Sequence, residues 1–349
     1  RLDFMKNITI VGTVLSLAIT SSISGQDPIK QPQVTILTTG GTIASRSEAP
    51  SLEGHALIQA VPQLLDYATV NVEEIARTGS SRITPEIWLL IGKRINEIFA
   101  SNPNLSGVVV THGTATLEET AYFLNLTAKV EIPIVLVGAQ RPASGMGTDS
   151  GINLVNAIRT AGHPDSRGRG VLGVLNDEIH FSRDMTKTST LRQQTFKSHD
   201  FGLLGHADWD KVAYYRMPER RRAPNTEFDV RGMKDLPRVD ISVTYAGTHG
   251  TAIDAFAAAG AKGIVVGTMA PGYVPPVEFE KLQAAAEKGI IIVHSTRAGS
   301  GRVADVASRR VDGTVLADNL PPQKARILLT VALTKTDDPV ELQRIFDQY

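Results

Sequence analysis

The stretch VTILTTGGTIA, residues 34–44, decides the fold more than any other part of the sequence. Its first half is a short β-rich apolar run, which is typical of a buried strand, and the glycine pair that follows ends this strand abruptly. Similar apolar runs recur at residues 107–111, 134–137 and 171–175, separated by segments with helical periodicity. This alternation predicts an α/β fold built on a mostly parallel sheet with crossover helices.

Two helices between these runs have recognisable beginnings. Thr84-Pro85 places a capping side chain before a proline at the first helical position, and apolar residues then recur at helical spacing. Thr116, with Glu119 three residues later, has the pattern of a capping box, in which each side chain binds a backbone N–H of the first turn. The second helix is therefore expected to begin directly behind the strand that ends near Thr111.

The composition of the chain limits the kinds of partner that it can have. A length of 349 residues exceeds what one hydrophobic core usually organises, so we expect two domains. Basic and acidic residues are balanced at 36 each without long runs, which favours a small-molecule substrate over nucleic acid or a membrane surface. Cysteine is absent and HExxH does not occur, and we expect no cofactor.

The first 25 residues have the layout of a secretory signal peptide. Met5-Lys6-Asn7 precedes an apolar stretch at residues 8–19, and small or polar residues follow. The apolar stretch is too short to span a bilayer as a stable helix, so we expect cleavage and no membrane association afterwards. The sequence thus predicts a periplasmic or secreted protein, in which residues 1–4 before the methionine are extraneous.

Beyond this segment, the pattern divides the chain into two α/β domains. We expect the N-terminal catalytic domain over residues 33–213 and the C-terminal domain over residues 236–349. The linker between them, residues 214–235, is charged and contains prolines. The second domain repeats the alternation of strands and helices, with apolar runs at 239–243, 263–266 and 289–293 and helical patterns at 324–335 and 340–349.

Two strand ends carry the residues that could perform chemistry, because ligands of doubly wound sheets bind beyond the carboxyl ends of the strands. Thr42 follows the glycine pair of the first strand, and Thr114 follows a histidine and a glycine at the end of the second. One hydroxyl could attack a carbonyl while N–H groups at a helix start hold the oxyanion, as acyl transfer requires. A glycine-rich turn of this kind can also be only a turn, or a phosphate cradle.

Several segments together resemble one family. TGGTIA at 39–44 and THGTATLEET at 111–120 resemble the two signature segments of the bacterial type II L-asparaginases, in which each supplies one catalytic threonine. Further similarity lies in VGAQRPAS at 137–144, DMTKTSTLRQQTFKS at 184–198, FDVRGMKDLPRVDI at 228–241 and NLPPQKARILLTVALTKTDDP at 319–339. The resemblance implies a larger N-terminal domain with a mostly parallel sheet and a smaller C-terminal α/β domain. It also implies a homotetramer, a dimer of dimers, that hydrolyses L-asparagine, with glutamine as a further candidate, to the acid and ammonia.

The same resemblance assigns roles to individual residues. Thr42 resembles the nucleophile, Thr114 the second catalytic threonine, and Lys187 the lysine that polarises Thr114. A threonine hydroxyl needs such a neighbour, because it is a poor nucleophile until another group accepts its proton. The substrate-binding residues that the resemblance implies are Ser80 and Ser81, for the α-carboxylate, together with Gly113, Ala115 and Ala139.

Two departures from the family pattern concern the substrate. Ala115 stands where the family has an aspartate that binds the substrate's α-ammonium, and loss of a charged partner in a buried polar site typically costs about 2–5 kcal/mol. Between Ile43 and Leu65 there is no tyrosine, although the family's lid carries one near the nucleophile. Two alternatives therefore stay open: an amidase for a related carboxamide that lacks a free α-ammonium, and a non-catalytic periplasmic solute-binding protein.

Overall fold

The computed structural model describes residues 31–40 and 54–349, and the chain from Gln31 to Tyr349 forms one compact unit. The expected signal peptide and Thr42 lie outside the described residues. Within the described part, no helix is both long and apolar enough to cross a bilayer. The unit contains two main sheets, each with helices on both faces, which confirms the predicted two-domain α/β fold.

The larger sheet has eight strands in the order β10-β9-β6-β5-β4-β3-β1-β2. Neighbours from β2 to β5 run parallel, whereas β6, β9 and β10 form an antiparallel edge. The four apolar runs found in the sequence are four adjacent strands, β1, β3, β4 and β5. The strands are β1 (Gln33–Thr38), β2 (Thr69–Glu74), β3 (Gly107–Thr111), β4 (Ile134–Val137), β5 (Val171–Leu175), β6 (Glu178–Phe181), β9 (Gly205–Ala207) and β10 (Val212–Tyr214).

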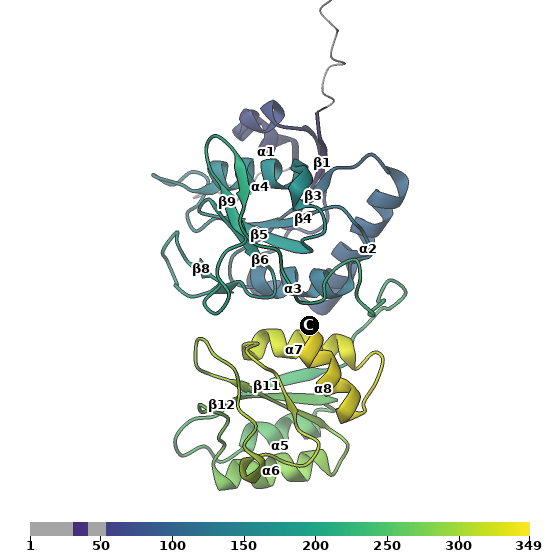
Figure 1. The fold of residues 1–349 in the computed structure, drawn as a ribbon, viewed down its shortest axis with the longest axis vertical. Helices are drawn as coiled ribbons and strands as arrows, with labels where there is room; N and C mark the ends of the chain where they lie inside the picture. Colours follow the sequence, from purple (N-terminus) through teal and green to yellow (C-terminus); the bar gives the residue numbers. More distant parts are fainter. Residues whose placement is uncertain (1–30, 41–53) are drawn as a thin grey trace, which may run out of the picture. The chain divides into compact units, whose positions relative to one another are not determined.

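Helices cover both faces of this sheet, because its central strands are apolar on both sides (Figure 1). In β3, Val109 belongs to the same buried cluster as side chains of α1 and α4, whereas Val108 and Val110 belong to the cluster that includes side chains of α2 and α3. The helices are α1 (Gly54–Ala60), α2 (Pro85–Ser101), α3 (Leu117–Thr127) and α4 (Ser150–Gly162), with short 3-10 turns η2 (Pro62–Asp66), η3 (Ser80–Arg82) and η4 (Pro164–Ser166).

The smaller sheet is parallel throughout, in the order β11-β12-β13-β14. Its two faces are also covered: Ile264 and Val266 of β12 pack with α5 and α6, and Val265 packs with α7 (Figure 1). The elements are β11 (Val239–Val243), α5 (Thr251–Ala258), β12 (Gly263–Thr268), α6 (Pro276–Ala286), β13 (Ile291–Thr296), η5 (Ala307–Arg309), β14 (Val315–Leu316), α7 (Pro322–Ala332) and α8 (Pro339–Gln348).

Helix α7 of the smaller domain also packs against α3 of the larger one. Buried apolar side chains of both helices, such as Leu124 and Leu328, belong to one continuous cluster. The helix that begins behind β3 therefore rests on the C-terminal domain.

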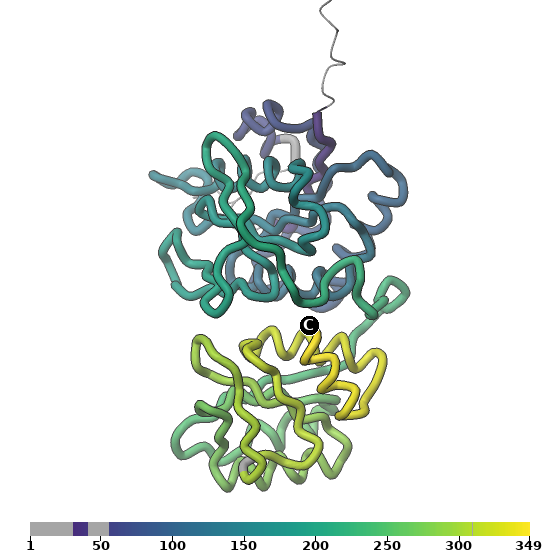
Figure 2. The backbone as a smooth tube through the Cα atoms, viewed as in Figure 1, coloured from purple at the N-terminus to yellow at the C-terminus, as the bar shows by residue number. Residues whose placement is uncertain are grey.

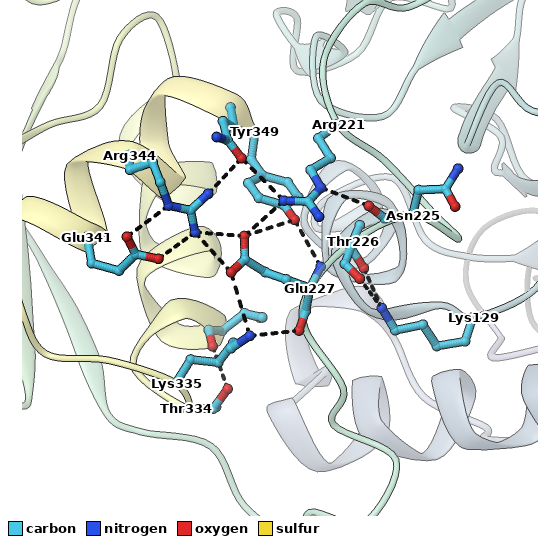
Figure 3. A network of polar contacts seen from close by, with 12 residues as sticks. Lys129, Arg221, Asn225, Thr226, Glu227, Thr334, Lys335, Glu341, Arg344 and Tyr349 are labelled. Atoms are coloured by element: carbon cyan, nitrogen blue, oxygen red, sulfur yellow. Dashed lines mark hydrogen bonds and ion pairs between the residues drawn. The ribbon is translucent and has the colours of Figure 1, made fainter.

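Residues 215–238, all of which the structure describes, form no helix or strand between β10 and β11 (Figure 2). The expected linker therefore lacks the strands and helices of the flanking domains, while the exact domain boundaries stay a prediction. The segment is nevertheless firmly attached, since Phe228 is buried with its ring centroid 5.0 Å from that of Tyr349. Next to it, the Glu227 carboxylate accepts two bonds of 3.0 Å from Arg344 and lies 3.6 Å from Lys335 Nζ (Figure 3).

The predicted capping box at the start of α3 is wrong, although the helix begins at Leu117 as expected. The Thr116 hydroxyl donates to the Ser80 carbonyl at 2.8 Å instead of accepting from the first turn. Glu119 turns to Arg326 of α7, with 3.8 Å between Oε2 and Nη1. Both side chains that the local pattern predicted to cap the helix therefore bind residues far away in the sequence instead.

The start of α2 shows the same difference. The helix begins at Pro85, but the Thr84 side chain makes no capping hydrogen bond. A hydrogen bond from Thr84 instead lowers the pKa of the Glu86 carboxyl. The local sequence therefore predicted where this helix starts but not how its end is satisfied.

Candidate active site

The carboxyl ends of β1 and β3 lie side by side, because Thr38 pairs with Thr111 in the parallel register. The Thr39 side chain and N–H both donate to the Thr111 carbonyl, at 2.8 and 3.2 Å. Gly40 has a φ of +94°, and a Cβ there would lie 2.8 Å from the Thr78 carbonyl oxygen. Only glycine fits such a turn, so the glycine that the sequence places here lets the chain leave β1 at the edge where β3 also ends.

Three polar groups meet at this edge. Lys187 Nζ donates to Thr114 Oγ1 at 2.7 Å, although the two residues are 73 positions apart. Lys187 lies on β7 (Thr186–Lys187), which pairs antiparallel with β8 (Phe196–Lys197). Gln140 Oε1 lies 3.3 Å from Lys187 Nζ and 3.4 Å from Thr114 Oγ1. Gln140 was not among the expected site residues, although it directly follows Ala139 in the VGAQRPAS segment.

Lys187 is placed to exchange a proton with Thr114. Burial lowers the pKa of Lys187 below its ordinary value, and the Glu118 carboxylate partly opposes this shift. A lowered pKa increases the fraction of neutral amine, which is the form that can accept a proton from a hydroxyl. The short contact with Thr114 and the lowered pKa therefore both suit Lys187 to act as a general base.

A second group of expected residues lies on the other side of Thr114. Ser80 Oγ accepts a hydrogen bond from the Ala115 N–H at 3.3 Å. A Cβ on Gly113 would lie 2.5 Å from Ser80 Oγ, so Ser80 comes this close only because residue 113 is glycine. Ala115 is exposed, as is Ser81, and no hydrogen bond among the described residues joins Ser81 to the others. The structure thus brings Ser80, Gly113 and Ala115 together with Thr114, but not Ser81.

The remaining expected residue, Ala139, is buried in the turn after β4. A Cβ on the preceding Gly138 would lie 3.0 Å from Thr114 Cγ2, which places this turn against the catalytic candidate. The Asp149 carboxylate fixes the turn by accepting from the N–H groups of Gln140, at 3.0 Å, and Arg141, at 2.9 Å. The backbone at Ala139 is therefore held beside Thr114 by Asp149, which was not among the expected site residues.

His112 stands in the same turn as Thr114 but is fully buried, and burial lowers its pKa to about 4. Its Nδ1 lies 2.8 Å from the Gly113 carbonyl, which can only accept, so Nδ1 carries the proton. Its Nε2 then accepts from Thr120 Oγ1 at 3.0 Å, and Thr120 accepts from Trp88 Nε1 at 2.8 Å. Each group in this row of hydrogen bonds has a partner. His112 is therefore a neutral structural residue that orients the Gly113 carbonyl.

The arrangement combines a hydroxyl, a lysine of lowered pKa and backbone turns at a strand edge. In the described part of the chain, no three His, Cys, Asp or Glu side chains are grouped so that they could hold a metal ion. The groups that are present suit proton transfer to and from a hydroxyl, which is the requirement of acyl transfer at an amide.

Comparisons with known proteins agree with this geometry. The N-terminal asparaginase domain matches residues 33–220, and the glutaminase/asparaginase C-terminal domain matches residues 238–346. The chain is 41% identical over 338 residues to L-asparaginase 2 of Bacillus subtilis (strain 168), covering 94% of this chain and 90% of the relative. It is 41% identical over 329 residues to the probable periplasmic L-asparaginase of Haemophilus influenzae (strain ATCC 51907 / DSM 11121 / KW20 / Rd), covering 91% and 93%.

A solved structure extends the similarity to three dimensions. The crystal structure of the probable cytoplasmic L-asparaginase from Campylobacter jejuni superposes with a TM-score of 0.88 at 40% identity. The match covers 91% of this chain and 100% of that one. Since both domains match in order over nearly the whole described length, this chain belongs to the asparaginase family.

Proposed function

We propose that this protein hydrolyses a small carboxamide to the carboxylate and ammonia, with L-asparagine as first substrate and glutamine as second. The observation that carries the proposal is the 2.7 Å contact between Lys187 Nζ and Thr114 Oγ1 at the edge where β1 and β3 end. The names of the relatives, all asparaginases, support the choice of substrate.

In the proposed mechanism Thr42 is the nucleophile. Its hydroxyl oxygen attacks the amide carbon, and its proton passes to the pair formed by Thr114 and the neutral amine of Lys187. The C–N bond then breaks, and ammonia leaves with a proton returned by the same pair. Water attacks the resulting ester and gives up a proton to Lys187 through Thr114. As the bond between the acyl carbon and the Thr42 oxygen breaks, the same pair returns this proton to the Thr42 oxygen, which releases the acid and restores the hydroxyl.

Mutation of the three proposed catalytic residues tests this mechanism. Thr42→Ala should abolish ammonia release without changing folding, since it deletes only one hydroxyl. Thr114→Val and Lys187→Met should each lower kcat strongly, and the double variant should be little slower than either, because groups that act as a unit do not contribute independently. Wild-type ammonia release by Thr42→Ala would sink the mechanism, and stoichiometric asparagine binding without turnover by the wild type would favour the solute-binding alternative.

A second candidate substrate is a related amide without a free α-ammonium. It is favoured by the exposed methyl group of Ala115, at the position where the family carries an aspartate. Ala115→Asp should raise kcat/KM on asparagine and lower it on the uncharged amide, where the new carboxylate would be desolvated without a partner. The measurement is kcat/KM of both proteins on asparagine, glutamine, succinamate and N-acylated asparagine. Unchanged ratios across these substrates would mean that position 115 does not face the amino group.

Export to the periplasm and assembly into a homotetramer complete the proposal. The layout of residues 1–25 supports export, as does the word periplasmic in the name of the H. influenzae relative, although the C. jejuni relative is named cytoplasmic. Mass spectrometry of protein from a cell fractionation should find the chain shortened by the signal segment in the periplasmic fraction. Light scattering should give the mass of four chains, and a fully active monomer would contradict the assembly.

A further inference from the structure

Lys324 on α7 is a buried charged residue that the proposed mechanism does not use. Its side chain is completely shielded from solvent, yet its Nζ donates to the carbonyl oxygens of Ser182 and Arg183, both at 2.7 Å, and to that of Met185. We call this arrangement the Lys324 tripod. It spans the two domains, because α7 belongs to the smaller domain and residues 182–185 follow β6 of the larger sheet.

The geometry of the tripod requires an ammonium rather than an amine. An ammonium has three hydrogens and no lone pair, so it can satisfy three carbonyl acceptors at once. A neutral amine would turn its lone pair toward one of them. Burial lowers the pKa of Lys324 to about 8, which still leaves the group mostly protonated at neutral pH. The ring of Tyr122, with its centroid 5.9 Å from Nζ, adds a further favourable contact for the cation.

The three carbonyls belong to a tight turn that leads directly into the strand carrying Lys187. Within this 182–185 turn, the N–H groups of Asp184 and Met185 both donate to the Phe181 carbonyl at 3.0 Å. Three carbonyls of such a turn converge and repel one another unless a cation lies between them. Met185 is followed by Thr186 and Lys187 of β7, so the position of the Lys187 backbone depends on this turn.

The turn also binds the smaller domain through the Arg183 side chain. Arg183 Nε donates to the Tyr349 carbonyl at 2.6 Å, and its Nη1 donates to Asn319 Oδ1 at 2.8 Å. These bonds from residues much later in the chain add to those that the turn makes within its own domain, such as the one from the Ser182 N–H to the Val171 carbonyl at 3.1 Å.

We propose that Lys324 is a positioning residue for catalysis, which holds the Lys187 amine against Thr114 by binding the turn from which β7 starts. The inference rests on the proposed catalytic role of Lys187. It gives the C-terminal domain a function within the active site of its own chain, although Lys324 contacts neither Thr114 nor the space beside it.

The first test compares Lys324→Met with Lys335→Met. Lys335 is the matched control, because it also comes from the smaller domain and binds a carbonyl of the interdomain segment, that of Glu227, but lies away from the turn. A misplacement of about 1 Å at a catalytic group can cost on the order of 100-fold in rate, so Lys324→Met should lower kcat by about 10- to 100-fold. The KM for asparagine should change little, and Lys335→Met should match the wild type in both constants.

The double variant Lys187→Met/Lys324→Met separates positioning from a general loss of stability. If Lys324 acts through Lys187, the double variant should be no slower than Lys187→Met alone. A further loss in the double variant would mean that Lys324 acts by another route, and the inference would fall. Full activity of Lys187→Met would instead overturn the proposed mechanism and this inference with it, whereas wild-type kcat in Lys324→Met alone overturns only the inference.

A chemical rescue decides whether the ammonium itself matters. The chain has no cysteine, so Lys324→Cys can be alkylated at that position alone, in denaturant before refolding. Aminoethylation rebuilds a lysine analogue and should restore kcat, whereas S-propylation gives a side chain of equal length without charge and should not. Equal kcat for the two products would overturn the inference. If Lys324→Met is not recovered folded, Lys324→Gln, which keeps donor hydrogens, replaces it in the comparison and should fall between the wild type and the S-propyl protein.

Discussion

Gly113→Ala offers a direct test of the substrate side of the site. The added methyl group would lie 2.5 Å from Ser80 Oγ and 2.8 Å from Ser80 Cβ, where ordinary contacts of a Cβ are 3.4–4 Å. The backbone of residue 113 is held by its carbonyl, which accepts from His112 Nδ1, so Ser80 is the group that must give way. The shortfall is roughly 1 Å, a displacement that can cost on the order of 100-fold in an active site.

The loss should appear mainly in KM for asparagine if Ser80 binds the substrate's carboxylate, because binding lost equally in ground and transition states leaves kcat unchanged. The contact between Thr114 Oγ1 and Lys187 Nζ does not involve Ser80, so kcat should fall much less. Gly79→Ala is the matched control, since a Cβ on that neighbouring glycine would meet nothing within 4 Å. Steady-state ammonia release over a range of asparagine concentrations measures both constants. Equal KM values for Gly113→Ala and Gly79→Ala would refute the placement of Ser80 in the substrate site.

Three further predictions follow from buried groups. Thr120→Val removes the hydroxyl between Trp88 Nε1 and His112 Nε2 and should lower the free energy of unfolding by about 2–5 kcal/mol in urea titration; a loss under about 1 kcal/mol would mean that the two nitrogens find other partners. The pKa of His112 falls from 6.5 to about 4 in the fold, so its contribution, roughly 3 kcal/mol, is present above pH 6.5 and lost as pH drops toward 4. The difference in unfolding free energy between wild type and His112→Asn should shrink over that interval, and a constant difference would contradict the buried neutral state. Glu118→Gln removes a carboxylate that raises the pKa of Lys187, so the acid limb of the kcat profile should move to lower pH; an upward shift would exclude Lys187 as the base.

The parallel core of the fold could be predicted from the sequence because its strands are apolar on both faces. Runs such as 107–111 and 134–137 have no other stable place than a sheet covered by helices on both sides. The antiparallel edge formed by β9 and β10 was not foreseen, because three-residue strands give no readable alternation. The capping box at Thr116 failed for a different reason, since the pattern describes only local partners and both side chains bind residues far away in sequence.

A sequence pattern describes only local partners, and this also decides which parts of the site the sequence indicates. Thr114 and Lys187 come from segments with a family resemblance, and the structure brings them into contact. Gln140 and Lys324 also lie in such segments, but nothing in these segments indicated what either side chain contacts, and Asp149 lies in none of them. A lysine in a helix normally lies on the surface. Lys324 can be buried because its ammonium donates hydrogen bonds to carbonyls more than a hundred positions earlier. No short segment of sequence contains both the lysine and these carbonyls.

The distance in sequence across the Lys324 tripod has a consequence for synthesis of the protein. A ribosome adds Lys324 210 residues after Thr114 and 137 residues after Lys187. A chain whose translation stops before α7, or from which a protease removes α7, would therefore carry Thr114 and Lys187 but not the ammonium that we propose holds Lys187 in place. If Lys324 positions Lys187 as proposed, such a chain would hydrolyse amides more slowly than the finished one. For an exported enzyme, this delay would spare the cell's own asparagine until the polypeptide has left the ribosome and folded in its final compartment.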